Sequence, residues 1–88
     1  MTEEQSVTAG WRTVGMCGDG ELFDLAGLNP WEYDWDSQSE RIVVAHPYYP
    51  AQRHDVGVWV IRAPDRVVRF AAGEMSNGAW AFFLPVYP

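Results

Sequence analysis

Three apolar segments separated by two short turns fill the C-terminal half of the chain, and this arrangement restricts the fold more than any other feature. The segments are rich in Val, Ile, Phe and Trp, which favour strands. They cover residues 55–63, 66–75 and 79–87. The turns, Pro64-Asp65 and Asn77-Gly78, are typical of hairpin loops. We therefore predict an antiparallel three-stranded meander, with Asn77 and Gly78 both at positive φ in a type I′ turn.

The two turns also predict which residues lie opposite each other. Pro64-Asp65 places Trp59 opposite Phe70, and Asn77-Gly78 places Ala72 opposite Phe83. One predicted face, interrupted by two arginines, carries Val56, Val58, Val60, Val67, Ala71, Phe82, Leu84 and Val86. The other, interrupted by one glutamate, carries Trp59, Ile61, Val68, Phe70, Ala72, Phe83 and Tyr87. Because both faces are apolar, each needs a cover, either from residues 28–36 and the N-terminal strands or from another molecule.

The N-terminal half predicts shorter elements. "GWRTVGM" and "ELFDLAG" are expected to form a first hairpin across the turn "CGDG". In "LNPWEYDW", Asn29 is a candidate cap and Pro30 suits the first position of one helical turn. A loop is expected after it, over Asp34, Asp36, Ser37 and Ser39. "RIVVAH" follows as a strand, and its unbroken apolar run predicts burial on both faces or a central place in the sheet.

With 88 residues the chain is expected to form one domain, residues 10–88, after a flexible N-terminus at residues 1–9. The predicted fold class is mainly β. We expect a small antiparallel β-roll or open barrel of five or six strands, with a C-terminal three-stranded meander and at most one short helical turn.

Charge and composition restrict the partners. The net charge is −6, and all six basic residues are Arg. Because an acidic surface repels phosphate, direct nucleic-acid binding is not expected, whereas a protein with a basic groove is a suitable partner. The apolar runs are too short to cross a membrane, and the acidic, polar N-terminus predicts a cytoplasmic location. The single cysteine, Cys17, has no partner for an internal disulfide.

The stretch "HPYYPAQRHD", residues 46–55, holds the densest set of chemically versatile side chains. His46 and His54 flank the loop, so their imidazoles are expected to approach each other, and Asp55 lies next to them. These residues would suit a general base, an anion clamp or two metal ligands. The spacing matches no established metal motif, and Cys17 has no histidine near it in sequence. We predict no catalytic residues, no metal and no cofactor.

The acidic run "EYDWDSQSE" interleaves carboxylates with aromatic rings. Such a run resembles phosphates beside bases in charge, and so could occupy a nucleic-acid groove on another protein. The alternative is a solvated loop whose two aromatic side chains fold back onto the sheet.

Three functions remain open after these observations. The first is a non-enzymatic acidic protein-binding module of inhibitor type, such as a bacterial immunity factor or a phage-encoded inhibitor of a nuclease complex. The second is a small-molecule binder or enzyme that uses the loop from His46 to Asp55. The third is a structural subunit that self-associates, with a homodimer as its simplest form. The predicted partner-contact residues are Trp59, Phe70, Phe83, Tyr48, Tyr49, Arg53, His54, Glu32, Asp34, Trp35 and Asp36.

Overall fold

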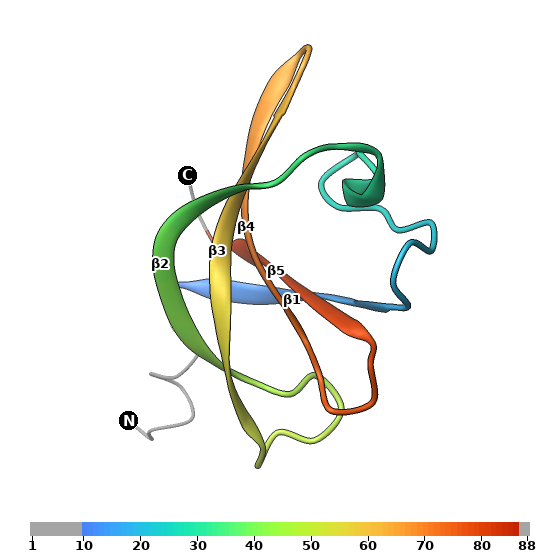
Figure 1. Ribbon diagram of the computed structural model, residues 1–88. Helices are drawn as coiled ribbons and strands as arrows, with labels where there is room; N and C mark the ends of the chain where they lie inside the picture. Colours follow the sequence, from blue (N-terminus) through green and yellow to red (C-terminus); the bar gives the residue numbers. More distant parts are fainter. Residues whose placement is uncertain (1–9, 87–88) are drawn as a thin grey trace.

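A computed structural model describes residues 10–86 as five antiparallel strands in one open sheet (Figure 1). The strands are β1 (Trp11–Cys17), β2 (Asp36–Ala45), β3 (Arg53–Ala63), β4 (Arg66–Glu74) and β5 (Trp80–Pro85). Their order across the sheet is β1-β5-β4-β3-β2. One 3-10 turn, η1 (Pro30–Glu32), precedes β2. The predicted fold class is confirmed. The predicted flexible N-terminus and the placement of Tyr87 lie outside the described residues.

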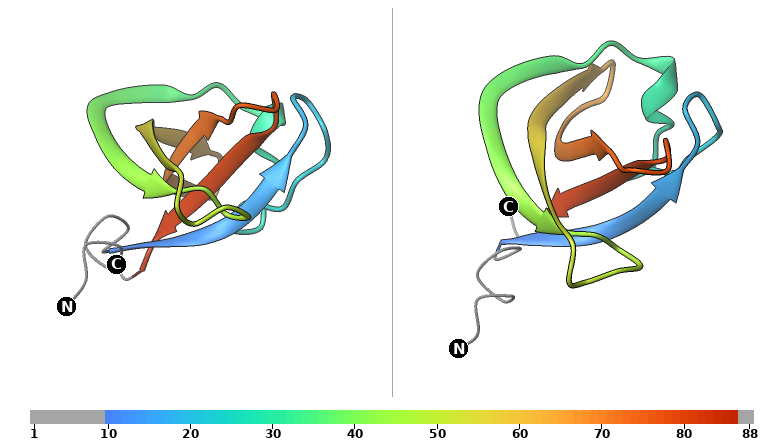
Figure 2. Two further views of the ribbon diagram at one scale, coloured as in Figure 1. Left: turned by 90° about the horizontal axis from the view of Figure 1, so that it is seen from below. Right: turned by 60° about the horizontal axis from the view of Figure 1, so that its bottom comes forward.

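The sheet is strongly curled, so that β2 and β3 bend around the other strands (Figures 1 and 2). β1 and β2 are its two edges. No helix among the described residues is long and apolar enough to span a membrane.

The predicted pairing of β3 with β4 is confirmed. Trp59 lies opposite Phe70, and Ile61 lies opposite Val68. The reason is the two-residue loop Pro64-Asp65, which joins the paired residues at the ends of both strands and fixes the register.

The predicted pairing of β4 with β5 is wrong by one residue. Phe82 lies opposite Ala72, and Phe83 lies opposite Ala71. The loop has three residues instead of two: the Met75 N–H donates to the Ala79 carbonyl at 2.7 Å, and Gly78 alone has positive φ, at 86°. This shift moves Phe82 and Phe83 to the faces opposite those predicted, because side chains alternate along a strand.

The predicted first hairpin is also wrong. β1 pairs with β5, not with residues 21–27, and Thr13 lies opposite Phe83 in this ladder. Residues 21–27 form no named strand, although Leu25 and Leu28 make one isolated bridge. The turn at residues 18–21 exists, with the Glu21 N–H donating to the Gly18 carbonyl at 3.1 Å, but it leads into an irregular segment.

β2 departs from the prediction in length and position. It begins at Asp36, inside the predicted loop, and its pairing with β3 is interrupted between Ser37 and Arg41, where Ser39 has φ of 55°. It is an edge strand, not a central one. Its apolar run is therefore buried on one side only: Val44 has no exposed surface, whereas Val43 is 45% exposed.

Two apolar clusters cover the two faces of the sheet. The first, the strand cluster, receives side chains from all five strands or the turns that end them. Its buried members are Val44, Val56, Val58, Ala71, Met75, Ala81 and Phe83. The second, the covered cluster, combines β-strand residues with side chains from the connection between β1 and β2. Its buried members are Cys17, Leu25, Ile61, Val68, Phe70, Ala72, Phe82 and Leu84. Of the two covers considered for this face, residues 28–36 or another molecule, the structure shows the first, because Leu28, Trp31 and Trp35 pack against this cluster.

Aromatic rings attach this connection to the sheet. The Phe23 ring stacks on Phe82 with centroids 4.7 Å apart. Trp35 meets Phe70 at 5.1 Å and Trp80 at 5.6 Å, both edge to face. Its indole N–H also donates to the Pro30 carbonyl at 2.9 Å. η1 forms as predicted, with the Asn29 side chain accepting from the Trp31 N–H.

Candidate functional site

The loop at residues 46–52, called the tyrosine loop below, connects β2 to β3 and is tied to its own backbone. The Tyr48 N–H donates to His46 Nδ1 at 3.0 Å, and the His46 N–H donates to the Gln52 carbonyl at 2.9 Å. The Gln52 N–H in turn donates to the Tyr49 carbonyl at 2.8 Å. These bonds hold the loop in one shape.

The two histidines approach each other as predicted, with ring centroids 5.6 Å apart. Both imidazole rings contact residues of the tyrosine loop. His46 is buried and its Nδ1 accepts a backbone N–H, while His54 Nε2 lies 3.3 Å from Gln52 Oε1. Among residues 10–86, no group of three or more His, Cys, Asp or Glu side chains is placed to hold a metal ion.

The tyrosine loop exposes its aromatic rings. Tyr48 is 68% exposed and Tyr49 is 59% exposed. The loop is yellow-green in Figures 1 and 2, and it projects from the body of the protein at the end opposite η1. Of the other predicted contact residues here, Arg53 is exposed and His54 is half-buried. A projecting loop with a hydrogen-bonded backbone and exposed aromatic side chains suits contact with a partner's surface.

The predicted aromatic stripe of Trp59, Phe70 and Phe83 is not a surface in the structure. Phe70 and Phe83 have no exposed area, and the shifted register places them in different clusters. Trp59 is half-buried, with its indole N–H donating to the Ala72 carbonyl at 3.3 Å. Trp59 and Phe70 form no exposed surface because the connection between β1 and β2 packs against the face on which they lie.

The predicted acidic contact residues divide by side-chain type. Glu32, Asp34 and Asp36 are exposed, whereas Trp35 is half-buried among the rings of the covered cluster. The Asp36 carboxylate pairs with Arg62 at 3.3 Å. This arrangement matches the alternative in which the aromatic side chains fold back onto the sheet and the carboxylates face solvent.

The negative charge of the chain is concentrated in the connection at residues 18–35, called the acidic segment below. It carries no Arg and five carboxylates, all on exposed residues: Asp19, Glu21, Asp24, Glu32 and Asp34. The remaining described residues, 10–17 and 36–86, hold five carboxylates and six Arg side chains. Exposed pairs such as Arg41 with Asp55 and Arg69 with Glu40 balance much of this charge. The acidity predicted for the whole protein therefore belongs mainly to one segment.

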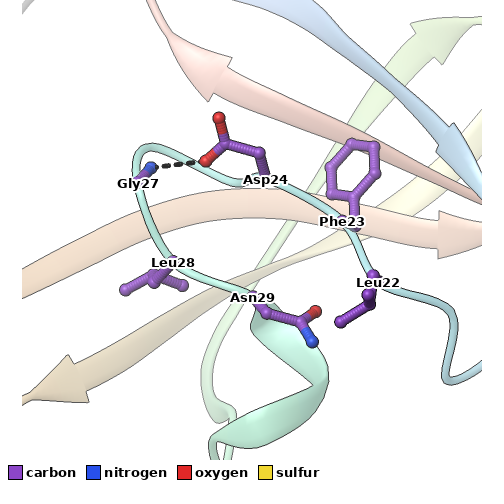
Figure 3. A pocket seen from close by; sticks show the side chains of 6 residues that line it. All are labelled: Leu22, Phe23, Asp24, Gly27, Leu28 and Asn29. Atoms are coloured by element: carbon purple, nitrogen blue, oxygen red, sulfur yellow. Dashed lines mark hydrogen bonds between the residues drawn. The ribbon is translucent and has the colours of Figure 1, made fainter.

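The acidic segment also forms a shallow hollow of about 390 Å³ (Figure 3). Six residues line it: Leu22, Phe23, Asp24, Gly27, Leu28 and Asn29. Leu22 is 85% exposed, while Phe23 is half-buried against the sheet. The Asp24 carboxylate accepts the Gly27 N–H at 2.9 Å, which closes the turn beside the hollow.

Sequence reasoning missed this hollow because it assigned "ELFDLAG" to a strand. The spacing of Asp24 and Gly27 was the available signal, since an Asp side chain commonly accepts a nearby backbone N–H in a turn. The neighbouring Cys17 does not add chemistry to the hollow. Burial raises the pKa of its thiol, with smaller contributions from the negative charges of Glu21 and Asp19, although the Trp31 hydrogen bond lowers it. Cys17 is therefore a protonated core thiol at neutral pH.

No protein family, no curated protein and no solved structure significantly matches this chain.

Proposed function

We propose that this protein is a non-enzymatic protein-binding module that presents the acidic segment to a basic surface of its partner. The observation that supports this proposal is the uneven distribution of charge. Residues 18–35 carry five carboxylates and no Arg, whereas positive and negative charges nearly balance among the other described residues. Opposite charge on a partner would steer association and fix its orientation.

An inhibitor role is the specific form of this proposal. Carboxylates on a firmly anchored segment can occupy a groove that otherwise binds nucleic-acid phosphates. The aromatic contacts of Trp35 and Phe23 supply the anchoring, because they tie the segment to Phe70 and Phe82. A nuclease complex in the cytoplasm is the kind of partner that fits, and direct binding of nucleic acid does not fit a surface of this charge.

The tyrosine loop supports binding but not catalysis. Its exposed rings, Tyr48 and Tyr49, project from the protein, and the hollow at residues 22–29 is lined by other residues. A small-molecule site would instead place these side chains around a concavity. We therefore assign the loop to a second contact with the same or another protein.

The test begins with co-purification from the native host and measures association rates with the retained protein. The double variant Glu32→Gln, Asp34→Asn removes two charges from the acidic segment. We expect it to associate at least about threefold more slowly at low ionic strength, with a weaker dependence on salt.

The matched control is Asp55→Asn, Glu74→Gln, which removes the same charge from the sheet. We expect the control to associate at the wild-type rate within about a factor of two. Equal slowing in both double variants would show that only net charge matters, and unchanged rates in both would reject the proposal.

A further inference from the structure

We propose that the hollow at residues 22–29 receives an apolar side chain from a positively charged segment of the partner protein. This inference rests on the proposed function and specifies its partner: the segment carries a Leu-sized side chain with Arg or Lys on both sides.

The lining of the hollow suits an apolar side chain. Leu22, Phe23 and Leu28 give it apolar walls, and Asp24 and Asn29 supply the polar groups. Binding sites commonly combine such walls with a few polar groups that fix orientation, and a volume of about 390 Å³ lies within their usual range. The highly exposed Leu22 would lose its contact with water when a partner's side chain covers it.

Backbone hydrogen bonds fix the shape of the walls. Leu25 and Leu28 exchange two backbone hydrogen bonds, at 2.7 and 3.2 Å, around a two-residue turn. Ala26 and Gly27 in this turn have φ of 54° and 90°. Leu25 itself is fully buried, and an Arg66 guanidinium N–H donates to the Ala26 carbonyl. Because these hydrogen bonds hold the backbone of the walls, a partner does not have to order it.

The charges around the hollow favour a basic partner segment. Glu21 and Asp24 lie next to the hollow in sequence, and no Arg occurs in residues 18–35. Arg66 contacts this part of the chain through the Ala26 carbonyl, and Asp65 lies 3.4 Å from it. A basic segment is attracted to such a site. A second copy of this chain would bring its own net negative charge and is disfavoured.

The experiment uses three synthetic nonapeptides with neutral ends, titrated into the full chain labelled with 15N and followed by NMR. The first has a central Leu with two Arg on each side, and the second replaces this Leu by Ser. The third keeps the Leu and replaces every Arg by Glu. We expect the Leu-Arg peptide to shift the amides of residues 22–29 and to bind at least about fivefold more tightly than the Ser-Arg peptide. The Leu-Glu peptide should not bind.

Two single variants locate the contact. Leu22→Ser should abolish the difference between the Leu-Arg and Ser-Arg peptides, and it should leave the fold intact because this side chain is mostly in water. Val67→Ser is the matched control, since Val67 is also exposed, at 61%, but lies on β4. It should preserve the difference.

Each contrary outcome is specific. Equal binding of the Leu-Arg and Ser-Arg peptides would reject the apolar contact but leave the acidic surface of the proposed function standing. Binding of the Leu-Glu peptide would reject the charge argument. Shifts confined to other residues, or no binding at millimolar peptide, would reject the hollow as a site. Shifts of residues 22–29 that depend on protein concentration alone would identify a second copy as the occupant.

Discussion

The acidic segment and the curled sheet differ in the regularity of their backbone and in the balance of their charges. In the sheet, backbone ladders link neighbouring strands and exposed Arg–carboxylate pairs keep the charge near balance. In the segment, only the three residues of η1 and one isolated bridge are regular, and every charged side chain is negative. The segment keeps its shape because its half-buried aromatic side chains pack against the sheet. The sheet thus supplies the regular backbone framework, and the segment supplies a surface of one charge.

Phe82 joins the acidic segment to the sheet, and replacing it should give the largest loss of stability. Phe82 has no exposed area, and its ring contacts come from both regions: Phe23 and Trp31 in the segment, Phe70 in the sheet. We expect Phe82→Ala to lower the free energy of unfolding by about 3–5 kcal/mol, measured by urea denaturation. Val67→Ala, at an exposed site, should change it by no more than about 0.5 kcal/mol.

A loss of this size can unfold a domain with little stability to spare, so a milder pair sharpens the test. Phe82→Leu and Phe83→Leu each remove part of one buried ring, but Phe83 lies in the strand cluster and away from the segment. The near-ultraviolet circular dichroism of the tryptophans should weaken in Phe82→Leu more than in Phe83→Leu. Equal weakening would mean that the two clusters do not act separately.

The same division explains what the sequence could predict. The register of β3 with β4 follows from a local turn, so Trp59 and Phe70 were paired correctly. Asn77-Gly78 suits both a two-residue loop with two positive φ angles and a three-residue loop with Gly last. Because apolar residues occur on both faces of β5, a shift of one residue exposes no polar group to the core and the sequence does not forbid it.

Longer-range pairing lay beyond local sequence signals. β1 pairs with β5, nearly the whole chain away, whereas the neighbouring segment at 21–27 was the nearer candidate. Of the candidate site, the exposed carboxylates and the approach of His46 to His54 could be predicted from spacing. For the hollow, the spacing of Asp24 and Gly27 signals the turn, but not the walls, because Leu22 and Leu28 come together only through two positive φ angles.

The rate at which Cys17 is labelled shows whether the acidic segment opens while the sheet stays folded. Its thiol is buried, and the Trp31 indole N–H donates to Sγ at 3.4 Å. At pH 8 we expect a thiol reagent to label folded protein at least about a hundredfold more slowly than urea-unfolded protein, which corresponds to about 2.7 kcal/mol. If urea too dilute to unfold the sheet accelerates labelling, the segment opens first. Labelling that follows global unfolding alone would instead join the two regions into one cooperative unit.

The raised pKa of Cys17 also fixes the direction of a pH effect. The unfolded thiol ionises first as pH rises, so ionisation above roughly pH 8.5 favours the unfolded state. The contribution of the protonated Cys17 thiol to the free energy of unfolding is fully present below this pH. It is lost as pH rises through the pKa of the folded state. Urea midpoints should therefore fall more steeply over this range in the wild type than in Cys17→Ala. Parallel profiles would show that burial of the thiol does not perturb its ionisation.

Ala26 gives the smallest expected effect and tests the irregular geometry of the segment directly. A non-glycine residue at φ of 54° costs roughly 1–2 kcal/mol relative to ordinary backbone, whereas Gly adopts this conformation freely. Replacing Ala26 by Gly removes this cost, but the greater freedom of Gly in the unfolded chain offsets about 0.5–1 kcal/mol of the resulting stabilisation. We expect Ala26→Gly to raise the free energy of unfolding by about 0.5–1 kcal/mol. Ala51→Gly is the matched control, because Ala51 is exposed in a loop without positive φ, and it should lower the stability. If both substitutions destabilise alike, Ala26 does not have positive φ, and the turn that forms one wall of the hollow is not built as described.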